Sequence, residues 1–405
     1  MHTDKKNIKN NFPFFGAKKN ANLIYFDNAA TTHKPENVIS AISDFYRQNN
    51  SNIHRSTHLH GASATKEYES ARDCIAEFIS ARSSNEIIFT SGATEGVNLV
   101  ASSFGRANIK RGDIILVSEI EHHSNILPWM TVAQDVGAEI QKIPLDKKLM
   151  VDLKSFEKIL TNRVKMVAIH HISNVTGIMQ NIKSIVDLAH TFNVPVFVDG
   201  AQAPAHTNID VAQLNCDFYC FSSHKLFGPT GVGVLFVKNK HLKRLSPYKT
   251  GGQMVSVVAA GGATWAEAPL KFEAGTPNIS GVIGLNAAIQ FMQKCNLNKL
   301  ITVEKDLTLY MSNRLNEIPQ LIQYGLEGKS APIFAFNVKG VHHYDISSLL
   351  AQNNILVRAG HLCNQGFMNY FNIDGCVRVS LSIYNTFEEI DKFMSVLRKI
   401  ISFLK

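Results

Sequence analysis

The sequence of 405 residues contains few cysteines and no long apolar run. Its six cysteines are too few and too scattered for a disulfide framework, and none forms the C-x-x-C pair that structural zinc sites use. No apolar stretch approaches the length that a membrane-spanning helix needs. These absences argue against a disulfide-stabilised secreted protein, a zinc-stabilised fold and a membrane protein. We expect a cytoplasmic chain without a metal site.

Positive charge is abundant, but it is concentrated at one end of the chain. The formal net charge is +8, and residues 1–20 hold five lysines against the single acidic residue Asp4, which accounts for half of the excess. No basic stripe interleaved with aromatic side chains follows, so we expect no nucleic-acid partner. We expect residues 1–22 to form a basic N-terminal segment, with the first twenty residues as a solvated or disordered tail.

From about residue 85 onward, short β-rich runs such as "DIILVS" and "VPVFVD" alternate with helical stretches. This alternation predicts an α/β domain with a mostly parallel sheet covered by helices on both faces. After about residue 290 the pattern changes to long helical segments and short strands, which is typical of a smaller α+β domain. Because the chain exceeds what one core usually fills, we expect a large domain over residues 23–292 and a small C-terminal domain over residues 293–405.

The stretch "FYCFSSHKLFGPTGVGVLF", residues 218–236, sets Lys225 between an apolar run and a Gly-Pro-Thr-Gly turn. In open α/β sheets, the loops at the carboxyl ends of the strands form the ligand crevice. A lysine at such a strand end loses hydration, which lowers its pKa and makes the amine more nucleophilic toward a carbonyl. Although most lysines are surface charges, this position indicates a Schiff base with a carbonyl cofactor.

A pyridoxal phosphate site needs an acid at the pyridine nitrogen, an anion cradle and a flat group against the ring. Asp199 ends the buried run "VPVFVD" and Gln202 follows it, while His122 lies in "EIEHHSN". Alone, each has an ordinary explanation as a turn or capping residue. The strand-to-helix turn "SGATEG", residues 91–96, predicts the cradle, since free backbone N–H groups and the helix dipole attract an anion. Further donors to this cradle are Ser222 and His224.

Ten motifs occur in the order found in the class V branch of fold-type I pyridoxal phosphate enzymes, which the chain resembles from about Tyr25 to Asn385. They are "YFDNAATT", "SNIHRSTH", "SGATEGVNLV", "EHHSNILPW", "SNVTG", "VDGAQ", "DFYCFSSHKLFGPTGVG", "FEAGTPN", "VRAGHLC" and "RVSLSIYNT". Within this branch, the chain is similar to cysteine desulfurases of the sulfur-mobilisation and cysteine-sulfinate desulfinase group, which includes selenocysteine lyases. The resemblance implies a homodimer that uses pyridoxal 5'-phosphate and acts on L-cysteine.

The same resemblance implies a role for each matched residue. Lys225 would be the Schiff-base lysine that also moves the substrate α-proton, with Asp199 on the pyridine nitrogen and Gln202 on the ring oxygen. His122 would stack on the ring and assist proton transfer near the leaving sulfur. The implied phosphate contacts are Ala93, Thr94, Ser222, His224 and Thr276 of the partner subunit. The implied substrate contacts are Arg55, Arg358, Asn174 and Arg378, the last two on the carboxylate, Arg378 by a bidentate pair.

Cys363 in "VRAGHLC" matches the cysteine that takes the sulfur in this family. The resemblance implies that its thiolate, favoured by Arg358 and His361, attacks the sulfur of the cofactor-bound cysteine. This step leaves a persulfide on Cys363 and releases alanine. The sulfur would then pass to a dedicated acceptor protein by exchange chemistry and support iron–sulfur cluster or thio-cofactor synthesis.

The loop around Cys363 departs from the family pattern R-x-G-x-H-C-A-x-P. Leu362 replaces a common histidine, Asn364 a small residue and Gly366 a proline. Because proline restricts the backbone and glycine frees it, we expect a more flexible segment after Cys363.

Three other functions are compatible with the sequence. Selenocysteine lyase or cysteine-sulfinate desulfinase activity would use the same pocket with an easier leaving group, and "SNVTG" and "GVHHYD" are closer to the desulfinase branch. Another lyase or aminotransferase of the same fold would not need Cys363. A catalytically silent scaffold would fit the altered loop, but it would not need Lys225, Asp199, Arg378 and Cys363 together.

Overall fold

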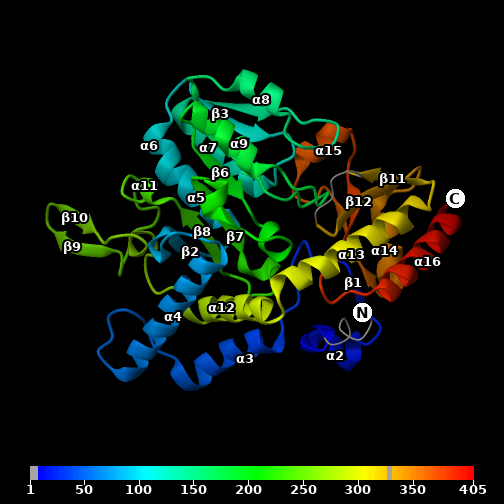
Figure 1. The fold of residues 1–405 in the computed structure, drawn as a ribbon, viewed down its shortest axis with the longest axis horizontal. Coiled ribbons are helices and arrows are strands. Elements are labelled where there is room, and N and C mark those ends of the chain that lie inside the picture. The colour runs from blue at the N-terminus through cyan, green and yellow to red at the C-terminus, as the bar shows by residue number, and fades with distance from the viewer. Residues whose placement is uncertain (1–7, 326–330) are drawn as a thin grey trace.

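The computed structural model describes residues 8–325 and 331–405, and its centre is a seven-stranded sheet (Figure 1). Only β8 runs antiparallel to its neighbours, so the predicted, mostly parallel sheet is confirmed. In spatial order its strands are β2 (Ile87–Thr90), β8 (Gly233–Val237), β7 (Phe218–Ser222), β6 (Val196–Asp199), β5 (Val164–His170), β3 (Ile114–Ser118) and β4 (Glu139–Ile143).

Helices cover both faces of this sheet, and strand residues alternate between the two cores as the period of a strand requires. In β3, Ile114 and Leu116 join one buried cluster, whereas Ile115 and Val117 join the other. The first cluster includes side chains of α4 (Leu59–Phe78), α9 (Ile182–Thr191) and α12 (Ile279–Lys294). The second includes those of α5 (Ala93–Val100) and α7 (Leu127–Val136).

A second, antiparallel sheet forms the C-terminal part of the fold. Its strands in order are β11 (Leu321–Tyr324), β12 (Ile333–Val338), β15 (Cys376–Ser380) and β14 (Arg358–Gly360). A separate core packs this sheet against α13 (Leu297–Asn316), α14 (His343–Gln352) and α16 (Phe387–Leu404). The short strand β1 (Ile24–Tyr25) pairs with β13 (Ile355–Leu356), which brings the N-terminal segment to this core. The two-domain division at residues 22 and 292 stays a prediction.

The remaining elements connect these layers. The longer ones are α3 (Glu36–Asp44), α8 (Leu153–Ile159) and α15 (Gln365–Phe371). A hairpin of β9 (Val255–Ala259) and β10 (Gly262–Trp265) projects from the body at the left of Figure 1. In the described parts of the chain, no helix combines the length and apolar character needed to cross a membrane.

The expected solvated tail is wrong for residues 8–20. Phe12 is buried, and its ring contacts Phe227, Phe291 and Tyr384 at centroid distances of 5.9, 5.6 and 4.7 Å. The lysine content suggested solvation, but the aromatic residues of "FPFF" pack against the body, while Lys18 and Lys19 stay exposed and Lys9 pairs with Glu389. Residues 1–7, which include Lys5 and Lys6, lie outside the described residues.

Candidate active site

A cavity of about 480 Å³ opens where the loops of the large sheet meet the C-terminal sheet. It lies at the carboxyl ends of β5, β6 and β7, the position that the sequence predicts for the ligand crevice. Twelve of the fourteen predicted site residues line it: Ala93, Thr94, His122, Asn174, Asp199, Gln202, Ser222, His224, Lys225, Arg358, Cys363 and Arg378.

Lys225 ends a single 3-10 turn, Ser223–Lys225, directly after the buried strand β7. The pKa of its amine is lowered to about 8, mainly by burial; the nearby Asp199 opposes this shift and Arg378 contributes to it. A substantial share of this lysine is therefore uncharged at neutral to mildly alkaline pH, which is the state that attacks carbonyls.

Asp199 and Gln202 lie beside Lys225, at the end of β6 and in the loop that follows. Asp199 Oδ1 accepts the Ala201 N–H at 2.9 Å, and burial raises the pKa of this carboxyl above its usual range. A buried carboxylate of this kind favours a cationic partner, such as a protonated ring nitrogen. The Gln202 amide donates to Ala29 O at 2.8 Å and retains a second N–H.

His122 lies at the cavity wall just before a 3-10 turn, His123–Asn125. Its Nδ1 accepts the Ser124 N–H at 3.1 Å. Burial, followed by the positive charge of Lys225, lowers the pKa of its imidazole to about 3. The ring is therefore neutral, carries its proton on Nε2 and offers an uncharged flat surface to a bound aromatic ring.

The predicted anion cradle is assembled at the start of α5. The Ala93 N–H donates to Ser222 Oγ at 2.8 Å, and Thr94 Oγ1 lies 2.8 Å from Ser124 Oγ. Both contacts join the helix start to neighbouring loops and gather hydroxyl and N–H donors at the positive end of the helix dipole. Ser124 also lines the cavity, and the sequence analysis missed it, although "EHHSN" places it next to His122.

Arg378 is buried at the cavity, held by Asp27 and by the backbone of Asn174. Its Nη1 donates to Asn174 O and its Nη2 to Asp27 Oδ1, each at 3.0 Å. Arg358 also donates to Asp27, with Nη2 2.8 Å from Oδ2. The Arg378 guanidinium keeps further donors, and its Nε has no partner among the described residues. Asp27 was not among the predicted site residues, although it is a carboxylate that directly follows the apolar run "LIYF".

Cys363 is an exposed residue of the cavity wall, and its loop has an unusual backbone. Leu362 and Cys363 have φ values of 55° and 54°, a left-handed conformation that side chains other than glycine rarely adopt. Leu362 is buried against Phe367, whereas the next residue faces solvent. Cys363 O accepts the His123 N–H at 2.8 Å, so this loop is tied to the loop that carries His122.

The residues that depart from the family pattern have specific contacts. Asn364 is fully buried and caps α15, whose Phe367 N–H donates to Asn364 Oδ1 at 3.0 Å. At Gly366, an added Cβ would lie 2.1 Å from Glu119 O. Glycine thus allows a close approach between α15 and residue 119, a packing role that the sequence analysis did not anticipate.

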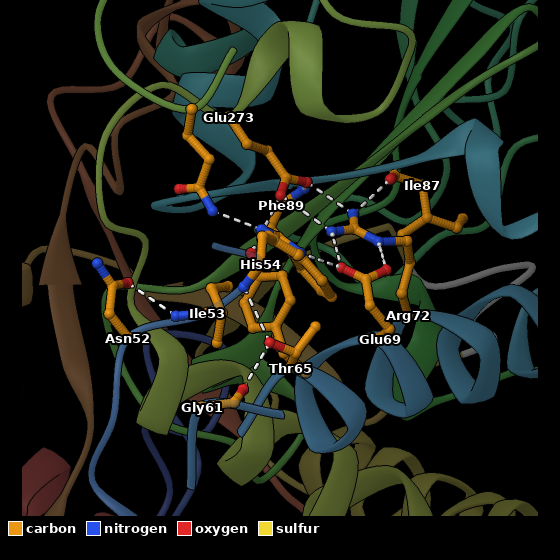
Figure 2. A network of polar contacts seen from close by, with 12 residues as sticks. Asn52, Ile53, His54, Gly61, Thr65, Glu69, Arg72, Ile87, Phe89 and Glu273 are labelled. Atoms are coloured by element: carbon orange, nitrogen blue, oxygen red, sulfur yellow. Dashed lines mark hydrogen bonds and ion pairs between the residues drawn. The ribbon is translucent and has the colours of Figure 1, made fainter. Parts of the chain in front are cut away.

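Two predicted site residues, Arg55 and Thr276, do not line this cavity. Residues near them in the sequence belong to the polar network of Figure 2, in which Arg72 of α4 donates to Glu273 Oε1 at 2.7 Å and to Glu69 Oε2 at 2.9 Å. Asn52 Nδ2 donates to Thr276 Oγ1 at 3.3 Å, and His54 contacts Glu69 at 2.8 Å. These contacts link Asn52 to Thr276 and tie His54 and Glu273 to α4.

Comparisons with known proteins agree over almost the whole chain. The Aminotransferase class-V family matches residues 24–393. A "Probable cysteine desulfurase" of Halalkalibacterium halodurans is 44% identical over 393 residues, and a "Cysteine desulfurase" of Shigella sonnei is 41% identical over 395 residues, each covering 97% of both chains. The crystal structure of the cysteine desulfurase CsdA (S-sulfonic acid) from Escherichia coli has a TM-score of 0.92 and 36% identity, covering 99% of both chains.

Proposed function

This chain belongs to the class-V aminotransferase family and is a pyridoxal phosphate-dependent cysteine desulfurase, and we propose that Lys225 and Cys363 carry its reaction within one cavity. The observation that supports this assignment is that a desolvated lysine and an exposed cysteine, 138 residues apart in sequence, line the same cavity. Neither residue alone would distinguish this activity from that of other enzymes of the family.

The residues of the cavity fit pyridoxal 5'-phosphate. A buried carboxylate, a neutral imidazole, a helix-start anion cradle and a lysine with lowered pKa are the groups that this cofactor needs. When bound, the cofactor withdraws electrons from the substrate α-carbon and so makes its substituents labile. We assign Asp199 to the ring nitrogen, Gln202 to the ring oxygen, and the phosphate to donors of Ala93, Thr94, Ser222 and His224.

Lys225 has two roles in this proposal. Its uncharged Nζ would hold the cofactor at the aldehyde carbon, and the amine, once free, would accept the proton from the substrate α-carbon. His122 would lie against the ring of the bound cofactor and, through Nε2, would hold a proton near the leaving sulfur. The low pKa of His122 keeps its imidazole neutral, so it places no second positive charge beside the Lys225 amine.

Arg378 and Asn174 bind the substrate carboxylate. Arg378 already points two of its N–H groups at Asp27 and Asn174 O, which fixes the guanidinium plane for an incoming carboxylate. Arg358 is partly exposed and adds positive charge at the cavity mouth.

The Cys363 thiolate attacks the sulfur of the substrate. A sulfur–sulfur bond forms while the carbon–sulfur bond breaks, and its electron pair stays with the β-carbon. The β-carbon takes up a proton, the Lys225 amine returns its proton to the α-carbon, and the product leaves as alanine. Cys363 retains the sulfur as a persulfide. Because this cysteine is exposed, a thiol of an acceptor protein can attack the persulfide and take the sulfur for iron–sulfur cluster or thio-cofactor synthesis.

A homodimer would complete the site. Thr276 and Arg55 are absent from the cavity of their own chain, and Thr276 accepts a hydrogen bond from Asn52, which lies three residues before Arg55. We propose that this pair reaches the phosphate and the substrate of the partner subunit. The six cysteines are free, which fits a reducing cytoplasm as the working compartment.

The test is alanine release from L-cysteine by the purified yellow protein, with and without a reductant, beside release from selenocysteine and cysteine sulfinate. Turnover of cysteine that rises with a reductant, which discharges the persulfide, is the expected result. Alanine from selenocysteine or sulfinate but none from cysteine would move the function to the lyase or desulfinase alternative.

A further inference from the structure

Asn364 forms three hydrogen bonds from a position that no substrate can touch. The residue is fully buried and is not part of the cavity wall. Its Oδ1 accepts the Phe367 N–H at 3.0 Å, while its Nδ2 donates to Ile120 O at 2.9 Å and to Asn174 Oδ1 at 3.3 Å. Both ends of this amide are fixed by backbone groups, because an N–H can only donate and a carbonyl can only accept.

Asn174 is oriented by the same rule. Its Nδ2 donates to Leu362 O at 2.9 Å, and its Oδ1 is occupied by Asn364. The Asn174 side chain lines the cavity, so its second Nδ2 hydrogen remains for a ligand there. If the Asn364 donor were absent, only the hydrogen bond to Leu362 O would keep the Asn174 amide from turning its oxygen toward the cavity.

The carbonyl that Asn174 holds belongs to the first of the two left-handed residues before Asn364. Leu362 and Cys363 both have positive φ, and such a backbone persists only where surrounding contacts hold it. Leu362 O is bound by Asn174, and Cys363 O is bound by His123 N. Asn364 closes this set of contacts, because it ties the end of the loop to Ile120 as well as to Asn174.

We propose that Asn364 is a positioning residue that orients the Asn174 amide toward the substrate carboxylate and, through Leu362, holds Cys363 toward the substrate sulfur. This proposal rests on the proposed function and deepens it. A small residue, which the family pattern has at this place, has no amide with which to make this bridge, so the bridge belongs to the altered loop of this chain.

Two variants separate this role from simple helix capping. Asn364→Asp keeps an oxygen for the Phe367 N–H and is as good a cap as asparagine, but it cannot donate to Ile120 O or Asn174 Oδ1. Its carboxylate would draw the Asn174 Nδ2 toward itself and turn the Asn174 oxygen to the cavity, where it repels a carboxylate. Asn364→Ala loses the cap and the bridge but adds no charge.

The measurements are KM and kcat for alanine release from L-cysteine, the dissociation constant of L-alanine from the change in cofactor absorbance, and the melting temperature. We expect KM for L-cysteine and the dissociation constant of L-alanine to rise about fivefold in Asn364→Ala, which weakens one hydrogen bond to the substrate carboxylate. In Asn364→Asp both should rise about 30-fold, because the Asn174 oxygen then faces the carboxylate in place of an N–H donor. A capping role predicts the opposite order, with Asn364→Asp close to wild type, and that result would overturn the proposal.

Two controls complete the experiment. Asn181→Asp changes another helix-capping asparagine, at α9, whose Oδ1 accepts the Ser184 N–H, and it should leave both constants unchanged. In the Asn174→Ala background, adding Asn364→Asp should raise KM and the L-alanine dissociation constant less than twofold, because the Asn174 amide that Asn364 orients is absent. Additive effects would refute the bridge. Failure of the proposed function would differ, since wild type itself would then release no alanine.

Discussion

The Lys225 loop and the Cys363 loop meet at one cavity, but different forces hold them. Lys225 ends a turn between β7 and β8, two strands whose residues are all buried, and its pKa falls because the sheet excludes water. Cys363 is exposed and has a left-handed backbone. Its loop is held by two hydrogen bonds, one from the His123 N–H to Cys363 O and one from Asn174 Nδ2 to Leu362 O. In the proposed reaction, Lys225 needs a dry environment to hold the cofactor, whereas Cys363 needs access to a sulfur acceptor.

The two loops also differ in the free energy that their backbone conformations cost. A buried strand end requires no special backbone, whereas each left-handed residue of the other loop costs on the order of 1–3 kcal/mol. The contacts of Asn364, Asn174 and His123 must offset this cost. The cysteine loop is therefore the more easily disturbed of the two.

The largest expected effect is that of Lys225→Ala. Without the amine, both cofactor attachment and proton transfer are lost, and alanine release from L-cysteine should fall on the order of 10⁴-fold. The absorbance of the lysine-bound cofactor should disappear as well. Near-normal turnover in this variant would show that Lys225 is not the residue that attaches the cofactor.

Cys363→Ala should leave the cofactor absorbance unchanged and lower cysteine turnover roughly 100- to 1,000-fold, the size of loss typical for a positioned catalytic group. The measurement is alanine release beside an absorbance spectrum. Cys74→Ala is the matched control, because Cys74 is a half-buried residue of α4 away from the cavity. Full cysteine turnover in Cys363→Ala would make this loop structural and favour another lyase of the same fold.

The pH dependence of cofactor attachment should report the dry environment of Lys225. The neutral amine reacts, and the pKa is lowered to about 8, so the attachment rate of the cofactor-free protein should rise about tenfold per pH unit below pH 8 and level off above it. Stopped-flow absorbance measures this rate. A rise that continues to about pH 10 would mean that the amine is solvated and that its pKa is ordinary.

The smallest effect is expected for Gly366→Ala. The added Cβ would collide with Glu119 O, and overpacking of this kind lowers the free energy of unfolding by about 1–3 kcal/mol. Chemical denaturation measures the change. Gly16→Ala is the control, because a Cβ there meets nothing within 4 Å, and it should shift stability by less than about 0.5 kcal/mol. Equal stability of the two variants would show that α15 does not need its close approach to residue 119.

The sequence predicted the cofactor end of the site better than the sulfur end. Lys225, Asp199 and His122 follow apolar runs, and strand ends of one parallel sheet must meet at one edge, so their proximity follows from local pattern. The bond from Asn364 to Ile120 spans 244 residues and depends on two left-handed residues that no periodicity predicts. The burial of Phe12 was missed for a similar reason, since its partners come from distant helices and loops.

The hydrogen bond from His123 N to Cys363 O, together with the burial of Leu362, limits how far the sulfur can travel. Because the backbone of Leu362 and Cys363 is held in place, Cys363 Sγ moves only by rotation about its side-chain bond. The distance it covers in this way is much shorter than the width of a protein interface. In the proposed reaction, Cys363 would therefore stay in place while it gives up its sulfur. A recipient protein would have to bring its own thiol to the cavity mouth, so the shape of the recipient around that thiol would decide which proteins accept the sulfur.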